Sequence, residues 1–194
     1  MKNINKEIIE KAKAYALEEM EKYGTPKKEH FDLSNEKGQK LAKKLKADKD
    51  IVMLGTILMD LKLGECLKEN NVSEHVERSS AVSREFLEKF DLDNATVEKI
   101  INCIEAHHGK KEFICKEAEI CANADCYRFL SPRGIFAGLI LFGNRDDSVD
   151  VCLKKVEEKM NEKWNILTLD ICKKETQKDY NSFKKLIDKS IVKK

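Results

Sequence analysis

The segment 51–61 constrains the fold most, because it is apolar on every side except at Asp60. An apolar segment without a polar face predicts a helix that is buried all round. An ionised carboxylate in such a helix is costly unless a cation or strong hydrogen-bond donors hold it. Asp125 repeats the anomaly within the apolar segment 120–126. Two carboxylates expected in the core therefore mark candidate positions for a bound cation.

Apolar residues recur at helical spacing along almost the whole chain, which has only two prolines and eight glycines. We expect an all-α fold, because no alternating pattern of convincing length predicts a strand. Gly24 and Gly109 are expected to end helices, and the loop is expected at about 63–72. Four residues or pairs are typical helix starts: Thr25-Pro26, Asp48, Ser73 and Ser131-Pro132.

The chain is expected to form one domain over residues 1–194, with a core at about 25–143. At 194 residues it can bury on the order of 70% of its unfolded surface. A highly charged helical extension, at about 145–194, is predicted from sparse apolar spacing such as Val149, Cys152, Val156 and Met160. This appendage is expected to pack on the core, with a pocket wall or an oligomer contact as alternatives.

The formal net charge of +2 gives no reason to expect nucleic acid or an acidic membrane as a partner. No apolar run reaches the ~20 residues of a membrane span, and the polar first residues are unlike a signal peptide. We therefore expect a cytoplasmic protein whose seven cysteines stay reduced. Their spacing does not match paired zinc ligands, so most are expected to pack in the core.

The order of the polar residues resembles the HD phosphohydrolase superfamily. Its signature is one histidine, then a His-Asp pair ending a buried helix, then a distant Ala-Asp dipeptide. The matching positions are His30, Met59-Asp60, His75 in the sequence His-Val-Glu-Arg-Ser-Ser-Ala, His107-His108 after Ile104, and Asn123-Ala124-Asp125. Met59 stands where the family has the histidine of the His-Asp pair.

The resemblance implies an HD-domain helical core with a metal held by His30, Asp60 and Asp125. Carboxylate and imidazole ligands suit a divalent ion such as manganese, iron or magnesium. A thioether is a poor ligand for such an ion, so Met59 is expected to weaken the site.

The resemblance also implies catalytic roles for His75 and His107 in orienting a water or protonating a leaving group. His108 is an alternative to His107, because either can face the site. Arg78 is the candidate phosphate contact, since arginine is rare in this lysine-rich chain and binds phosphate bidentately. A surface arginine without a function is the alternative.

Two functions follow from these residues. The first is a metal-dependent phosphohydrolase with a weakened metal site, acting on a small-molecule phosphomonoester; nucleotides are the family's commonest substrates. The second is a catalytically silent HD-fold protein that binds a nucleotide or a protein partner. The retained histidines and aspartates favour the enzyme by a small margin. Met59, and Arg128 where relatives often carry an aspartate, favour the silent protein. The sequence does not determine the oligomeric state.

Overall fold

The computed structural model describes residues 4–145 and 148–191, and within these residues every regular element is a helix. The predicted all-α fold is confirmed. The elements are α1 (Lys6–Tyr23), α2 (Lys28–Leu45), α3 (Lys49–Leu58), α4 (Leu63–Lys68), the 3₁₀ turn η1 (Val72–Glu74), α5 (His75–Leu87), α6 (Asn94–Glu105), α7 (Lys116–Leu130), α8 (Pro132–Gly143), α9 (Val149–Ile166) and α10 (Asp170–Ser190).

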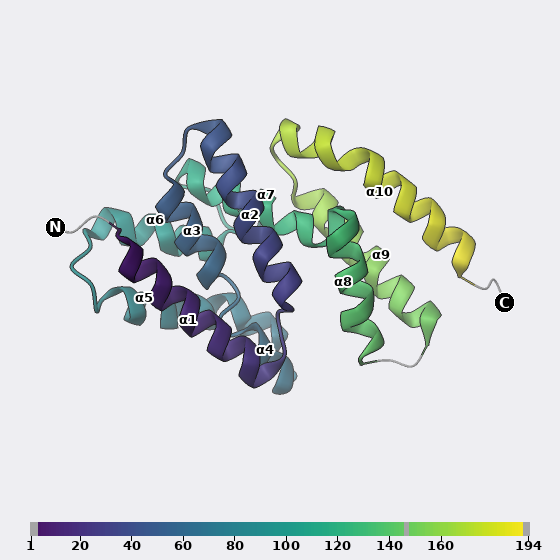
Figure 1. Ribbon diagram of the computed structural model, residues 1–194, viewed down its shortest axis with the longest axis horizontal. Helices are drawn as coiled ribbons and strands as arrows, with labels where there is room; N and C mark the ends of the chain where they lie inside the picture. Colours follow the sequence, from purple (N-terminus) through teal and green to yellow (C-terminus); the bar gives the residue numbers. More distant parts are fainter. Residues whose placement is uncertain (1–3, 146–147, 192–194) are drawn as a thin grey trace.

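Helix α7 is the centre of the molecule. It contacts α2, α3 and α6 on one side and α8, α9 and α10 on the other (Figure 1). Every residue from Ile120 to Leu130 is buried, so this helix is covered nearly all round. A polar side chain on α7 therefore has to find its partner inside the protein.

Local sequence signals set several helix ends. Asn5 Oδ1 accepts a hydrogen bond from the Ile8 amide, and Asp48 and Asp93 cap α3 and α6 in the same way. Gly24 and Gly109 have φ of 69° and 68°, a left-handed conformation that glycine adopts without steric cost. Gly24 ends α1 as the sequence predicts, whereas α6 already ends at Glu105 and Gly109 lies in the turn that follows.

The loop predicted at 63–72 is wrong in its first half, where α4 forms. The helix has no side-chain cap, so packing rather than local sequence determines it. A Cβ at Gly64 would lie 2.5 Å from Tyr23 Cβ and 2.7 Å from Thr25 O, which shows how closely α4 approaches the turn after α1. Periodicity along the chain carries no information about that contact.

Two predicted helix starts are also wrong. Helix α2 begins at Lys28 rather than after Thr25, whose hydroxyl instead accepts a hydrogen bond from Arg145 Nη2 at 2.6 Å. Helix α5 begins at His75, and Ser73 lies in η1 with its hydroxyl donating to Asn71 Oδ1. In both places the hydroxyl has another partner, so it does not cap the helix.

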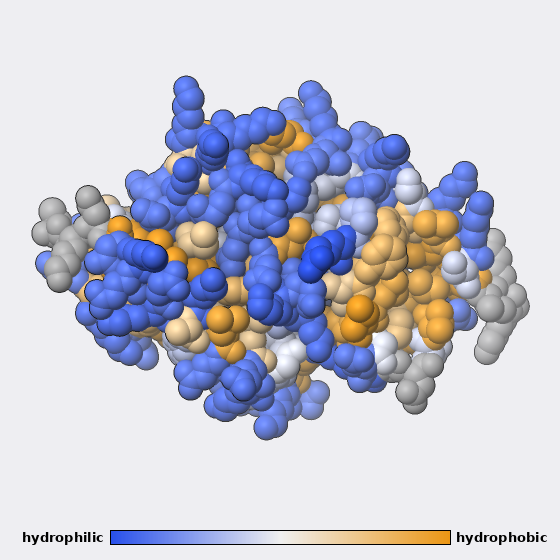
Figure 2. Space-filling view, viewed as in Figure 1, coloured by the Kyte–Doolittle hydropathy of each residue, from blue (hydrophilic) through white to orange (hydrophobic). Residues whose placement is uncertain are grey.

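The C-terminal helices pack on the core, with α9 against α7 and α8, and α10 against α9 and α7. Parts of the predicted extension, residues 146–147 and 192–194, lie outside the described residues. The surface in Figure 2 is largely hydrophilic, and apolar side chains gather over α8, where Phe136 and Ile140 are exposed. Among the described helices, none has the length and apolar character needed to cross a membrane.

All seven cysteines are free thiols, and six of them are buried. Cys103 and Cys121 lie where α3, α6 and α7 meet, against Gly55. This agrees with their predicted role as small core residues.

Candidate metal centre

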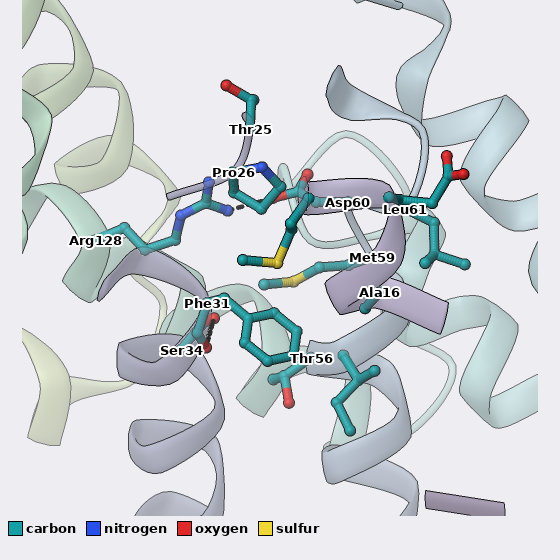
Figure 3. A pocket seen from close by; sticks show the side chains of 13 residues that line it. Ala16, Thr25, Pro26, Phe31, Ser34, Thr56, Met59, Asp60, Leu61 and Arg128 are labelled. Atoms are coloured by element: carbon teal, nitrogen blue, oxygen red, sulfur yellow. Dashed lines mark hydrogen bonds and ion pairs between the residues drawn. The ribbon is translucent and has the colours of Figure 1, made fainter. Parts of the chain in front are cut away.

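Asp60 and Asp125 come from different helices and meet the same guanidinium group. Asp60 lies in the turn after α3, and Asp125 lies fully buried within α7. Arg128, one turn after Asp125, donates from Nη1 to Asp125 Oδ1 at 2.7 Å and also to Asp60 Oδ2. Figure 3 shows the Arg128 side chain directed toward Asp60. The cation beside both carboxylates is therefore a side chain of the protein.

Lys163 is the second cation at these carboxylates. Its ammonium group lies 2.5 Å from Asp125 Oδ2, and the lysine side chain is only 4% exposed. Sequence analysis missed Lys163 because it lies in the charged extension. The sequence nevertheless contains a signal for its burial. Lys163 follows Met160 at a spacing of i+3 and so lies on the same face of the helix as the apolar residues Cys152, Val156 and Met160.

Both carboxyl groups are held in the ionised form. Burial alone raises the pKa of a carboxyl. At Asp60, the Arg128 guanidinium outweighs burial and lowers the pKa well below its ordinary value. At Asp125, Lys163 and Arg128 do the same and also lower the pKa. Two buried negative charges are thus balanced by two buried positive charges.

His30 is buried, but its ring is bonded to α8. Nε2 lies 2.9 Å from the Gly134 carbonyl oxygen and donates to it, and the ring packs against Phe129. Nδ1 is buried without a hydrogen-bond partner. Burial, followed by the charge of Arg128, lowers the pKa of His30 to about 4, so the ring is neutral at pH 7.

A second group of imidazoles lies on the other side of Asp60. One ring nitrogen from each of His75, His107 and His108 lies within 4.8 Å of the other two, and we call these residues the histidine cluster. His75 Nδ1 donates to Val72 O and His107 Nδ1 donates to Ile104 O, each at 2.6 Å. These bonds place the proton of each ring on Nδ1 and a lone pair on each Nε2, and His75 Nε2 is hydrogen-bonded to His108 Nε2. His107 Nε2 is buried without any hydrogen-bond partner.

Asp60 faces the histidine cluster with its second oxygen. Oδ1 lies 3.7 Å from His75 Nε2 and 3.6 Å from His107 Nε2, while His75 Nε2 lies 3.1 Å from His108 Nε2. Two ligand atoms that bind one ion at about 2.1 Å each are at most about 4.2 Å apart. Each of these three spacings is therefore short enough for that pair of atoms to bind the same cation.

The imidazoles of His75 and His108 are neutral at pH 7 and therefore available to a metal. Burial lowers the pKa of His75, and it lowers the pKa of His108 to about 4. A neutral imidazole binds metal without first losing a proton. The backbone carbonyls behind His75 and His107 orient the rings in the manner common for metal ligands.

The two possible ligand sets thus differ in how well they fit a divalent ion. At the predicted set of His30, Asp60 and Asp125, the carboxylates already hold Arg128 and Lys163, although His30 Nδ1 has no hydrogen-bond partner. This set does not fit a metal. The histidine cluster with Asp60 Oδ1 does, because its three imidazoles converge and the buried lone pair of His107 Nε2 has no hydrogen-bond partner. His107 and His108 are both members of the histidine cluster, so the structure does not favour one of them over the other.

Arg78 lies outside this centre. Its guanidinium contacts three carboxylates, at 2.6 Å from Glu69, 2.7 Å from Glu74 and 3.7 Å from Glu65. These carboxylates occupy the donors that a phosphate needs. Its role as the phosphate contact stays a prediction.

A narrow cleft opens beside Arg128, on the face of Asp60 opposite to the cluster. Met59, Phe31 and Pro26 line its apolar wall (Figure 3). The space inside it holds about one water molecule. Met59 lines this cleft and is almost fully buried.

Comparisons with known proteins identify the fold. No family model and no curated protein sequence matches this chain. Among solved structures, a predicted HD superfamily hydrolase from an uncultured Thermotogales bacterium is similar with a TM-score of 0.62 and 14% identity, covering 93% of this chain and 89% of that one. A protein from Lactobacillus plantarum is similar with a TM-score of 0.73 and 13% identity, covering 96% of each chain. The chain therefore has the HD-domain fold, as the order of its polar residues predicts.

Proposed function

We propose that this protein is a metal-dependent phosphohydrolase whose metal is held by the histidine cluster and Asp60 Oδ1. The observation that carries the proposal is the convergence of His75, His107 and His108, with two Nε2 lone pairs directed away from backbone carbonyls. In this proposal His75 and His107 are metal ligands, in place of the proton-transfer roles expected from the sequence. His30 and Asp125 are not ligands.

The donor set favours iron or manganese over magnesium, because imidazole suits transition metals and magnesium prefers oxygen. When bound, the ion supplies a hydroxide nucleophile near neutral pH and a Lewis acid for a phosphoryl oxygen. The carbonyls of Val72 and Ile104 keep the two rings in the ligating tautomer. Burial of His75, His107 and Asp60 limits the access of bulk water to them.

Charge balance supports a phosphomonoester as the substrate. The carboxylates of Asp60 and Asp125 are balanced by Arg128 and Lys163. A divalent ion adds two positive charges to this neutral centre, and a phosphate dianion neutralises them. His108 is the most exposed member of the cluster, at 21% of its side chain, so we propose that the substrate approaches from its side.

The test compares two buried histidines that each bond to a backbone carbonyl. Wild type, His107→Gln and His30→Gln are purified without chelator or nickel resin, analysed for metal and assayed with p-nitrophenyl phosphate and manganese. We expect metal and activity in wild type and His30→Gln, and neither in a folded His107→Gln. Loss of metal in His30→Gln with retention in His107→Gln would return the site to the ligands expected from the sequence.

A catalytically silent HD-fold protein that binds a nucleotide or a protein partner is the second candidate. It is favoured by the buried Met59 and by the two side-chain cations at the carboxylates. A folded wild-type protein that takes up neither manganese nor iron, and hydrolyses no phosphomonoester, would decide for this candidate.

A further inference from the structure

Arg128 and Lys163 occupy the positions from which a cation bridges Asp60 and Asp125. Arg128 Nη1 is within hydrogen-bond distance of one oxygen of each carboxylate, and Lys163 Nζ takes the remaining oxygen of Asp125. Only Asp60 Oδ1 is left to face the histidine cluster. Both cationic side chains are at least nine-tenths buried, so solvent does not compete for these contacts.

We infer that Arg128 and Lys163 replace a divalent ion at Asp60 and Asp125, so that this carboxylate pair is a metal-independent structural lock. The lock joins three parts of the fold: the end of α3 through Asp60, the central helix α7 through Asp125 and Arg128, and α9 through Lys163. This inference does not rest on the proposed function, because it holds whether or not the histidine cluster binds metal.

The physical argument is that a buried charge without a partner is expensive. Removing one member of a buried ion pair leaves an uncompensated charge and strongly destabilises the protein. Arg128 and Lys163 offset the charges of the two aspartates in the folded chain without any bound ion. A divalent ion at the same oxygens would face two fixed positive charges at contact distance, so these cations also exclude it.

The inference predicts that removing a cation creates a binding site for a metal ion. In Arg128→Met, one oxygen of each aspartate is left without its donor. A manganese ion added to this variant meets two buried carboxylates without the guanidinium, and Lys163 on Asp125 Oδ2 is the cation that remains. The free energy of that binding stabilises the folded state, so the melting temperature becomes dependent on manganese.

The experiment uses the full chain carrying His107→Gln, in which the histidine cluster is not expected to bind metal. Metal binding by the histidine cluster itself is measured separately in wild type. Melting temperatures are measured by circular dichroism in EDTA and in manganese. The parent protein, which carries only His107→Gln, is expected to have the same melting temperature in EDTA and in manganese. Arg128→Met on this background is expected to melt about 10 °C lower in EDTA and to recover at least half of that loss in manganese.

Arg84→Met is the matched control, because Arg84 also pairs with a carboxylate, Glu98, but at the surface. It is expected to change the melting temperature little and to show no effect of manganese. If Arg128→Met had the same melting temperature in EDTA as the parent, the inference that these ion pairs stabilise the fold would be wrong. An Arg128→Met variant whose loss manganese leaves unchanged would overturn the replacement of a metal.

Lys163→Met and Lys163→Met/Asp125→Asn test the lock without relying on Arg128→Met to fold. The double variant removes both charges of one pair, so it is expected to melt well above the single variant. If the single variants do not fold in EDTA, refolding from urea in manganese is the measurement. Folding that requires manganese supports the inference, and failure to fold in either solution contradicts it.

Discussion

Lys163 Nζ lies 2.5 Å from Asp125 Oδ2, and neither side chain is more than 4% exposed. The lysine comes from α9, in the charged part of the chain, and the aspartate comes from the central helix α7. The C-terminal helices therefore complete the interior of the candidate site.

Met59→His tests whether Met59 alone prevents metal binding at the carboxylates. We expect this variant to bind the same number of manganese ions as wild type, because Arg128 still bridges Asp60 and Asp125. Met59→His combined with Arg128→Met is expected to bind one ion more. Equilibrium dialysis with metal analysis measures both. An additional ion in the single variant would show that the metal displaces the Arg128 guanidinium from the two carboxylates.

His30 is expected to make stability depend on pH in the presence of chelator. Its pKa is about 4 in the folded chain, against an ordinary value of 6.5, so the unfolded chain binds the proton more strongly. The stabilisation is complete above pH 6.5 and falls as the pH drops toward 4. Between pH 7 and pH 5 the free energy of unfolding is expected to lose about 2 kcal/mol through this residue.

Urea denaturation of wild type and His30→Gln at several pH values measures this loss. The glutamine cannot take up a proton, so its stability is expected to fall less steeply between pH 6.5 and 4. Parallel curves for the two proteins would show that His30 does not contribute. His108, whose pKa is also lowered to about 4, remains in both proteins and accounts for part of the shared slope.

Asn123→Leu is expected to loosen the connection between α9 and α10. Asn123 Oδ1 accepts hydrogen bonds from the Thr168 and Leu169 amides, and Nδ2 donates to Glu119 O and Thr168 Oγ1. Leaving these amides without an acceptor is expected to cost about 2 kcal/mol. Thr168→Ala removes only the hydroxyl contact and is expected to cost well under half as much. Equal losses in urea denaturation would contradict this assignment.

Gly55→Ala is expected to destabilise the protein because α3 packs tightly on its neighbours. A Cβ at Gly55 would lie 2.5 Å from Cys103 Cβ and 2.8 Å from Cys121 Sγ. Overpacking of this kind is expected to cost about 1–3 kcal/mol. Gly143→Ala is the control, since a Cβ there meets nothing within 4 Å. If both variants have the stability of wild type in urea denaturation, the contact among α3, α6 and α7 is looser than described.

Local sequence determined where most of the helices form and which aspartates are buried in the core. Apolar spacing alone indicated that Asp60 and Asp125 are buried, because a helix that is apolar all round has no solvent-facing side. Gly24 marked the end of α1 because the left-handed conformation is costly for residues with a Cβ. These features depend on residues within one or two helical turns, so the sequence by itself was sufficient.

Only the tertiary structure decided which cation each buried carboxylate meets. Periodicity gives the face of a helix on which a side chain lies, but not the residue from a distant helix that packs against it. Lys163 reaches Asp125 because α9 packs on α7, and Arg128 reaches Asp60 because the turn after α3 lies beside α7. The same packing brings His75 to His107 and His108 and leaves His30 bonded to α8. The sequence thus determined that the buried aspartates need a positive partner, and the packing of distant helices determined that this partner is the protein's own arginine and lysine.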